Sequence, residues 1–355
     1  MGALDGIRVV DLTRFIAGPF CTVLLADMGA DVVKIESADG DPVRGQGVAS
    51  NGYSWYFAQF NRNKQSVVLD LYSAAGKERL RTLLRTADVV VENYRPGVFA
   101  RMGFDAAQLA ALNPRLIVAS VNGYGSSGPY VDRPAFDFIA QAMSGFMSVN
   151  GPPDEPPQRA APPISDLIAG LYCAFGVVCA LQSRERSGRG QQVESSLTGG
   201  LISMLAYLSA EVLATGRNPA RTGNDHPIVA PYGLFDAADG QIAVAPSNDT
   251  YVERFLQAVD LPQLLNEAAF CDNAARVRNR PQLNARINEM TRTRPVDEWI
   301  TAINAAGCPC GRVMALDEVF RDPQVLAQQM VIESQRPGQD AIRMTGFPVK
   351  LSATP

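Results

Sequence analysis

One carboxylate in the sequence stands where a nucleophile could be presented. Asp166 follows the proline-rich stretch 152–163 and begins an apolar run, in the segment PPISDLIAG (162–170). A carboxylate at a helix start is stabilised by the helix dipole and by the free N–H groups of the first turn, which would keep it ionised and nucleophilic. The same position suits a simple N-cap, formed by Asp166 or by Ser165, so these residues alone leave both roles open.

The sequence contains a single histidine, His226. This excludes a two-histidine metal site and proton exchange between paired histidines, and it leaves a serine–histidine triad with no spare imidazole. His226 could contribute to a site, or it could be a loop histidine bonded to the backbone. Cys308-Pro-Cys310 resembles half of a metal site, but no second pair accompanies it. We therefore expect no metal.

Charge and hydropathy narrow the classes of partner. The formal net charge is −4 and the basic residues are scattered, so we expect no nucleic-acid partner. No leader peptide is evident after Met1, and the longest apolar run, 167–181, is shorter than the roughly 20 residues of a membrane span. We expect a buried helix there, no membrane association, a cytoplasmic location and reduced thiols.

The first half of the chain alternates strand and helix. The predicted strands are 7–12, 31–36, 66–71, 87–93 and 116–125, and the predicted helices are 17–30, 74–86 and 106–112. The strands are almost continuously apolar, which is typical of strands buried on both faces. The pattern predicts an α/β fold with a doubly wound, mostly parallel sheet.

The second half predicts a smaller α+β domain. A helix is expected over 166–186, a strand over 191–197 and one further helix from Thr198 to about Gly216. A hairpin-like segment and polar helices follow, through Ala305. At 355 residues the chain exceeds the usual single core. We assign a large Rossmann-like domain to 1–200 plus 320–355, a small domain to 225–315, and linkers to 201–224 and 316–320.

A glycine-rich segment, 123–128, fits the dinucleotide-binding fingerprint and follows a predicted strand. That fingerprint requires a helix to begin at its third glycine. Pro129 and Pro134 prevent a regular helix here. The glycines instead predict a tight loop that lets the backbone approach something bulky.

Several segments resemble the class III coenzyme A transferases (the CaiB/BaiF type), which include formyl-CoA transferase, carnitine-CoA transferases and α-methylacyl-CoA racemases. The matching segments occur in the family's order: LDGIRVVDLT, AGPFCTVLLADMGADVVKIE, NRNKQSVVLDL, ADVVVENYRPGVFARMG, NGYGSSGPY, RPAFDFIAQAMSG, SDLIAG, GRGQQVESSL and CPCGRVM.

The resemblance implies a CoA transferase in which Asp166 is the catalytic nucleophile. Coenzyme A and acyl-CoA are then substrates, with a small carboxylic acid as acceptor and no tightly bound cofactor. The resemblance also implies an interlocked homodimer. By position in the family pattern, the residues expected to bind CoA are Ile16, Ala17, Leu69, Asp70, Leu71, Tyr72, Asn93, Tyr94, Arg95, Arg101, Ala135 and Phe136. Arg95 and Arg101 suit phosphate oxygens.

Some positions depart from the family pattern. Several relatives carry an arginine just after the segment that ends at Glu36, whereas Ser37 and Ala38 follow here, so Arg44 or Lys34 could substitute, or the contact is absent. The glycine-rich loop that formyl-CoA transferase closes over its aspartate has no counterpart. Tyr232 and Phe235 are candidates either for lining the acceptor pocket or for core packing.

Phe136 bears on the choice between transferase and racemase. The racemases carry histidine at this position, immediately before the aspartate that matches Asp137, and a phenyl ring cannot move a proton. We therefore favour a transferase, with a racemase and a CoA-binding protein without turnover as alternatives. Asp137 is expected either to orient Asp166 or the thioester, or to cap a helix.

Overall fold

The computed structural model describes residues 2–50, 53–335 and 341–354. The chain forms two compact units, which we call the large unit and the small unit. The large unit comprises Met1–Phe146, Arg159–Ser209 and Asp322–Pro355, and the small unit comprises Met147–Gln158 and Ala210–Arg321.

A six-stranded sheet with the order β5-β2-β1-β6-β7-β8 forms the centre of the large unit, and all of its pairings are parallel. Its strands are β1 (Arg8–Asp11), β2 (Asp31–Glu36), β5 (Lys64–Val68), β6 (Val89–Glu92), β7 (Ile117–Asn122) and β8 (Gln192–Ser196). The predicted α/β fold with a doubly wound parallel sheet is confirmed. The chain leaves β1 toward one edge of the sheet and β6 toward the other, so the direction of winding changes between these two strands.

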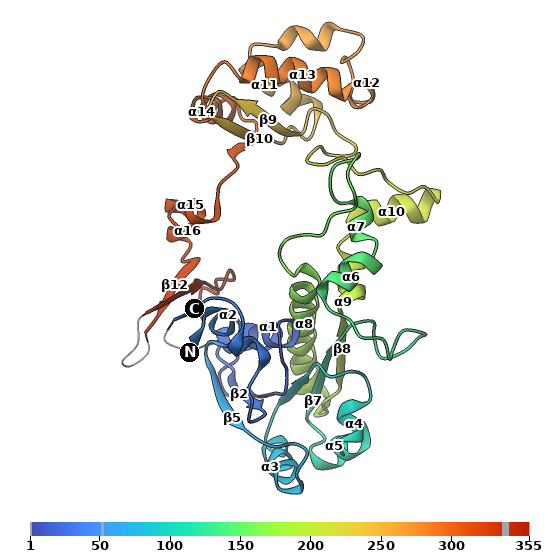
Figure 1. Cartoon of the computed structure of the whole chain (residues 1–355), viewed down its shortest axis with the longest axis vertical. Coiled ribbons are helices and arrows are strands. Elements are labelled where there is room, and N and C mark those ends of the chain that lie inside the picture. The colour runs from blue at the N-terminus through green and yellow to red at the C-terminus, as the bar shows by residue number, and fades with distance from the viewer. Residues whose placement is uncertain (1, 51–52, 336–340, 355) are drawn as a thin grey trace. The chain divides into compact units, whose positions relative to one another are not determined.

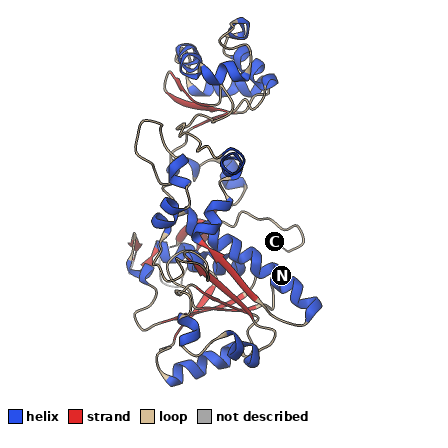
Figure 2. Cartoon of the chain, turned by 90° about the vertical axis from the view of Figure 1, so that its right-hand side faces the viewer, coloured by secondary structure: helices blue, strands red, loops and turns tan. Residues whose placement is uncertain are grey.

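Helices cover both faces of this sheet (Figures 1 and 2). The side chains of Val89 and Val91 belong to the core that α1 (Ala17–Asp27) and α8 (Ile164–Ser187) cover. Val90, between them, belongs to the opposite core, with residues of α3 (Ala74–Leu84), α4 (Val98–Arg101) and α5 (Ala106–Leu112). Because side chains alternate along a strand, a strand covered on both faces must be apolar throughout.

Helix α8 packs along α1 and against β7, β8 and α9 (Leu197–Ser203). The glycine at position 170 permits the close approach to α1. The helix is long and apolar enough to cross a membrane by length and composition alone. In the large unit, however, one face of it is buried on the sheet, while Leu171, Tyr172 and Phe175 are exposed. The predicted buried helix is therefore buried on one side only.

The structure also contains elements that the sequence analysis did not predict. The predicted helix 198–216 is two helices, α9 and α10 (Ala206–Thr215), because Ala206 adopts a left-handed conformation with φ of 51°. The additional elements are η1 (Pro42–Gly45), β3 (Ala49–Ser50), β4 (Tyr53–Ser54), α2 (Trp55–Asn61), α6 (Asp137–Met143), α7 (Phe146–Val149) and α16 (Pro323–Ala327). The C-terminal segment forms the antiparallel pair β12 (Val331–Ser334) and β13 (Ile342–Thr345), and β13 packs on α2.

The small unit has a three-stranded antiparallel sheet of order β11-β10-β9, covered by helices. Phe235, Phe255 and Trp299 are fully buried in its core, and Cys308 is buried there as well. The hairpin predicted before residue 246 is present as β9 and β10. The elements are β9 (Gly233–Ala237), β10 (Gly240–Val244), α11 (Asp249–Ala258), η2 (Pro262–Asn266), α12 (Asn273–Arg278), α13 (Arg280–Thr291), α14 (Val296–Ala305), β11 (Cys310–Arg312) and α15 (Leu316–Val319).

Candidate active site

Asp166 lies in the first turn of α8, at the third helical residue. The helix begins at Ile164 and its N-cap is Pro163, so neither Asp166 nor Ser165 is the N-cap. The side chain is half-buried, and no residue in the described ranges donates a hydrogen bond to its carboxylate. The carboxylate is therefore held by the helix but is not occupied by a structural contact, which leaves its oxygens available for chemistry.

The protonation of Asp166 differs from the sequence-based expectation. Burial raises the pKa of Asp166 to about 7, and the nearby charge of Asp137 contributes in the same direction. The helix start was expected to keep the carboxylate ionised. Instead, removing the carboxylate from water favours its neutral form by more than the helix dipole favours the charged form. A carboxylate with a pKa near neutrality is more basic, and hence a stronger nucleophile once ionised.

Asp137 lies at the first position of α6, whose N-cap is Phe136, so Asp137 does not cap its own helix. Its side chain instead accepts hydrogen bonds from Ser165, the residue before Asp166, through both the main-chain N–H and the hydroxyl, each at 2.9 Å. Asp137 is buried. Of the two roles predicted for it, a cap is present, but on the helix that carries Asp166.

Gly170 shows where α8 meets α1. A Cβ atom at position 170 would lie 2.4 Å from the main-chain oxygen of Ala17. Residues four apart share a helix face, so Asp166 lies one turn before this contact, on the side of the start of α1. The main-chain N–H groups in the first turn of a helix have no acceptor within that helix. At the start of α1 these are the N–H groups of Ala17 and Gly18; the next residue, Pro19, has no N–H group.

Aromatic side chains lie near this point. Burial raises the pKa of Tyr56, on α2, to about 12, and the charge of the Asp166 carboxylate contributes in the same direction. Phe136 is 61% exposed and meets Phe15 edge to face, with ring centroids 5.5 Å apart. Phe15 has a φ of 67°, a left-handed conformation that is uncommon for a bulky residue and that orients the loop between β1 and α1.

Of the predicted CoA-binding residues, Ile16 and Ala17 follow β1, and Asn93, Tyr94, Arg95 and Arg101 follow β6. Asn93 follows β6 and bonds both main-chain groups of Arg14, which follows β1: its Oδ1 accepts from the Arg14 N–H at 2.9 Å, and its Nδ2 donates to the Arg14 oxygen at 2.7 Å. The guanidinium of Arg14 lies 5.9 Å from the ring of Tyr94. Open parallel sheets bind ligands outside the strand ends where the winding direction changes, which is the place of this contact.

The remaining predicted positions differ in accessibility. Leu69 and Leu71 are buried in the core beside α3, so only their backbones could meet a ligand, whereas Tyr72 is 93% exposed. Asp70 accepts a hydrogen bond from the Tyr72 N–H at 2.9 Å. Arg95 and Arg101 are exposed, and within the described ranges neither has an ion pair. Ala135 is half-buried, and Gly123 packs on its Cβ.

The two cations considered as substitutes for the missing arginine are already paired. Lys34 is buried; its ammonium lies 3.0 Å from the Asp41 carboxylate and donates to the Thr13 carbonyl at 2.8 Å. Arg44 donates two hydrogen bonds to the Glu36 carboxylate, from Nε at 2.8 Å and from Nη2 at 2.6 Å, and its guanidinium lies over the Phe57 ring. Although burial opposes ionisation, Arg44 and Ser66 lower the pKa of Glu36 to about 2. Both cations therefore already have a carboxylate partner.

The residues predicted in the small unit make local contacts there. Nδ1 of His226 accepts a hydrogen bond from the Ile228 N–H at 3.3 Å, and the His226 ring lies 4.9 Å from that of Tyr232. Burial and the charge of Arg280 lower the pKa of His226. Phe235 is fully buried in the core, so core packing accounts for it. Among the described residues, no group of three or more His, Cys, Asp or Glu side chains is placed to hold a metal.

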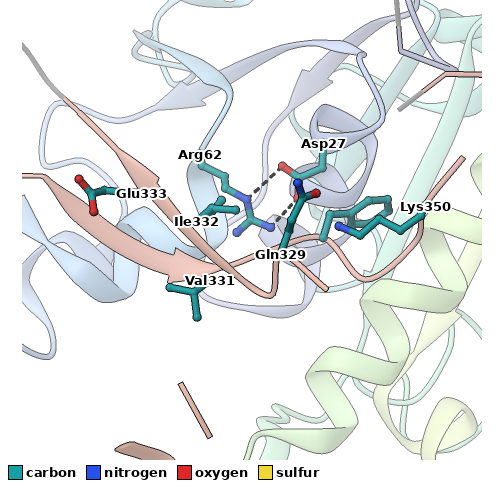
Figure 3. A pocket seen from close by; sticks show the side chains of 8 residues that line it. Asp27, Arg62, Gln329, Val331, Ile332, Glu333 and Lys350 are labelled. Atoms are coloured by element: carbon teal, nitrogen blue, oxygen red, sulfur yellow. Dashed lines mark hydrogen bonds and ion pairs between the residues drawn. The ribbon is translucent and has the colours of Figure 1, made fainter. Parts of the chain in front are cut away.

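A pocket of about 500 Å³ lies elsewhere on the large unit (Figure 3). It is lined by Asp27, Arg62, Gln329, Val331, Ile332, Glu333, Phe347 and Lys350. Asp27 pairs with Arg62 and is the last residue of α1, so it is about 15 Å along that helix from Ala17. The pocket contains none of the predicted site residues.

Three residues near Asp166 and Asp137 were not predicted from the sequence: Phe15, Tyr56 and Gln141. Gln141 is buried and donates to Asp137 at 2.7 Å. For Tyr56 a signal was available, since the aromatic run SWYFAQF (54–60) has the spacing of a short amphipathic helix. The conformation of Phe15 depends on tertiary structure and had no local signal, whereas Gln141 stands four residues after Asp137, a spacing at which such a hydrogen bond forms within a helix.

Comparison with known proteins gives consistent results. The sequence profile of one family, described as CoA-transferase family III, matches residues 4–355. The chain is 38% identical to acetyl-CoA:oxalate CoA-transferase of Acetobacter aceti over 353 residues, which cover 99% of this chain and 90% of that protein. It is 35% identical to succinate–glutarate CoA-transferase of Agrobacterium fabrum over 360 residues, covering 99% and 90% respectively.

A solved structure is similar throughout. The crystal structure of a CaiB/BaiF family protein from Brucella suis superimposes with a TM-score of 0.88 at 35% identity, covering 99% of this chain and 93% of that one. The likeness therefore extends over both units and is not limited to the parallel sheet.

Proposed function

The chain belongs to CoA-transferase family III, and from that premise we propose that it transfers coenzyme A from an acyl-CoA to a small carboxylic acid through covalent intermediates on Asp166. The observation that carries the proposal is the state of Asp166: a half-buried carboxylate in the first turn of α8, without a hydrogen-bond donor among the described residues and with a pKa raised to about 7.

The first half of the proposed reaction loads coenzyme A onto the protein. A carboxylate oxygen of Asp166 attacks the thioester carbonyl of the donor, the C–S bond breaks, and an acyl–aspartyl anhydride and CoA thiolate result. The thiolate then attacks the aspartyl carbonyl of the anhydride. The donor acid leaves as its carboxylate, and Asp166 remains as an aspartyl-CoA thioester.

The second half returns the chain to its starting state. The acceptor carboxylate attacks the aspartyl thioester, giving a new anhydride and thiolate. The thiolate attacks the acceptor's acyl carbon, so the acceptor leaves as its CoA thioester and Asp166 is regenerated as a carboxylate. No net proton or electron is consumed. The N–H groups of Ala17 and Gly18, at the start of α1, are suited to stabilise the negative oxygen formed in each attack.

Coenzyme A is proposed to lie across the carboxyl ends of β1 and β6, with its thiol end at Asp166. Support comes from the exposed guanidinium groups of Arg95 and Arg101, which have the geometry to bind phosphate. As acceptor we propose a short dicarboxylic acid, because the names of two relatives specify oxalate and glutarate.

Covalent trapping tests the proposal. The purified chain is incubated with succinyl-CoA or acetyl-CoA, treated with hydroxylamine, and measured by intact mass and peptide mapping. We expect a hydroxamate at position 166, which is absent from an Asp166→Asn variant and present in an Asp132→Asn control, since Asp132 is an exposed carboxylate of the same unit. If no donor gives an adduct, the covalent route is wrong and a CoA-binding protein without turnover is the better account.

Racemisation is less well supported. Exchange of an α-proton needs two opposed acid–base groups, and the position next to Asp137 is the phenyl ring of Phe136. Incubation with a 2-methylacyl-CoA in deuterium oxide, without an acceptor acid, should leave the α-carbon unlabelled. Deuterium at that carbon would favour the racemase instead.

A homodimer is also proposed. Helices α6, α8 and α9 pack against one another and expose large apolar side chains, which a monomer in water rarely does over a continuous surface. These are Phe138, Ile139 and Met143 of α6, Leu171, Tyr172 and Phe175 of α8, and Ile202 of α9. Light scattering should give twice the chain mass, and Phe175→Glu should lower it toward that of one chain. A monomeric parent chain would contradict the proposal.

A further inference from the structure

We propose that Asp137 is a positioning residue for Asp166: its buried carboxylate caps the first turn of α8 from a neighbouring helix and so fixes the residue next to Asp166. The inference rests on the proposed role of Asp166 as nucleophile. It assigns to Asp137 a function in the reaction without contact to the reacting atoms.

The cap is made through one oxygen. Oδ1 of Asp137 accepts from the N–H of Ser165 and from its hydroxyl, each at 2.9 Å. Ser165 is completely buried, and Asp137 is 8% exposed. Hydrogen bonds to an ionised carboxylate are the stronger kind, and here water cannot replace them. Because α8 has a proline as its N-cap and no side-chain cap of its own, this contact satisfies a first-turn N–H that would otherwise lack a partner.

The second oxygen of Asp137 extends the network to the segment before α8. Oδ2 accepts from Nε2 of Gln141 at 2.7 Å, and Oε1 of Gln141 accepts from the Ala160 N–H at 2.8 Å. Gln141 is completely buried. The network thus binds two residues to α6: Ala160, four residues before α8 begins, and Ser165, the second residue of α8. Asp166 follows Ser165 directly, so its place is set by this network as well as by α8.

The charge of Asp137 acts on Asp166 in addition to the hydrogen bonds. Within the part of the chain that the structure describes, the titratable groups close to the Asp166 carboxylate are Asp137 on α6 and the Tyr56 phenol on α2. On α1, the Cys21 thiol meets α8 farther along, at Cys173. Burial is the larger cause of the raised pKa of Asp166, and the negative charge of Asp137 is the second. A cap that served folding alone would not require a charged group, since a neutral amide oxygen also accepts hydrogen bonds.

Four variants separate positioning from folding. Asp137→Ala removes the cap and the charge. Asp137→Asn keeps an acceptor for Ser165 but removes the charge. Ser165→Ala removes only the hydroxyl bond and keeps the main-chain bond. The double variant Asp137→Asn with Gln141→Glu returns a carboxylate to the network, with an amide donor facing it. For each, the rate of adduct formation with succinyl-CoA is measured against pH, together with KM and the unfolding temperature.

For Asp137→Ala we expect adduct formation to slow by about a hundredfold with little change in KM, because displacement of a nucleophile by about 1 Å costs this much. Ser165→Ala should slow it by about tenfold at most. Asp137→Asn should move the midpoint of the pH–rate profile downward by about one unit, since a neighbouring negative charge is lost. The double variant should move the midpoint back toward the parent value.

Two results would overturn the inference. One is a folded Asp137→Ala chain that forms the adduct at the parent rate and with the parent pH midpoint. The other, which applies even if Asp137→Ala does not fold, is an Asp137→Asn chain with an unchanged midpoint and rate. Both are distinct from failure of the proposed function, in which the parent chain itself forms no adduct on Asp166.

Discussion

Gly170 on α8 lies against the main-chain oxygen of Ala17 on α1, so closely that a Cβ atom at position 170 would be 2.4 Å from that oxygen. Farther along the two helices, the buried thiols of Cys21 and Cys173 also meet. The contact at Gly170 fixes how near the first turn of α8, with Asp166, stands to the first turn of α1. The spacing of nucleophile and free N–H groups therefore depends on the absence of a side chain at one position.

We expect Gly170→Ala to impair both stability and catalysis. The added methyl group would meet the main chain of α1 at Ala17 and Cys21 and must therefore push α1 and α8 apart. We expect this to lower the free energy of unfolding by about 1–3 kcal/mol. Adduct formation on Asp166 should fall by more than the loss of folded protein explains. Urea unfolding and single-turnover trapping measure the two effects. Gly45→Ala is the control, because a Cβ at position 45 meets nothing within 4 Å; equal behaviour of the two variants would contradict the prediction.

The strands and helices of the large unit could be predicted well, because hydrophobic periodicity and the residues that end helices are properties of short stretches of sequence. The bounds of β2 and α5 match those of the predicted segments, and the end of α8 at Gly188, in a left-handed conformation, follows from the Ser187-Gly188 pair. The break at Ala206 could not be predicted in this way. The segment around it has good helix formers, and only tertiary structure overrides that preference.

For the site, the sequence placed Asp166 near the start of α8 but did not predict that the fold raises its pKa. The helix dipole can be predicted from sequence, whereas burial and the approach of Asp137 from α6 cannot, since the two aspartates are 29 positions apart along the chain. Lys34 shows the same limit. As a residue type it suits phosphate, but the fold buries it on β2, an interior strand of the sheet, with Asp41 as its partner.

A buried ionic network supports the loop between β1 and α1, and breaking it should be costly. Lys34 pairs with Asp41, while Lys64 pairs with Asp11 at 3.1 Å, and all four side chains are at most 1% exposed. Lys34→Met would leave Asp41 charged and buried without its partner, so we expect the free energy of unfolding to fall by about 3–5 kcal/mol.

The control for that variant is the same substitution at an exposed pair. Arg85 lies 3.4 Å from Glu78, and both side chains are more than half exposed, so Arg85→Met should cost less than about 1 kcal/mol. Urea denaturation at neutral pH measures both. Losses of similar size would mean that burial of the Lys34–Asp41 pair does not determine its contribution.

The rate of adduct formation should depend on pH through Asp166. Only the ionised carboxylate attacks, and burial together with Asp137 raises the pKa of Asp166 to about 7. The rate at low acyl-CoA concentration should therefore rise about tenfold per pH unit below neutrality and level off above about pH 8. Stopped reactions between pH 5 and 9 give the profile. A rate that is already constant from pH 5 would show an ordinary carboxylate.

Arg95 and Arg101 are predicted to bind phosphate groups of coenzyme A and not to take part in the chemistry. Arg95→Ala and Arg101→Ala should each raise KM for the acyl-CoA by about tenfold with little change in kcat, since the contact is the same in ground and transition states. The effect should shrink at high salt. Arg186→Ala, in the exposed last turn of α8, is the control. A fall in kcat with constant KM would place these residues at the reacting atoms instead.

Removing the carboxylate of Asp166 should stabilise the chain, and the gain should grow with pH. The ordinary pKa of 3.8 applies in the unfolded chain and about 7 in the folded one, so folding takes up a proton between these values. Stability is therefore full below about pH 4 and falls as pH rises through 7. Asp166→Asn avoids this loss: the difference in unfolding free energy should be near zero at pH 4 and reach about 2–4 kcal/mol at pH 8. Thermal unfolding across this pH range measures the difference, with Asp132→Asn, a change at an exposed carboxylate, as control. A difference that does not change with pH would show that folding does not raise the pKa of Asp166.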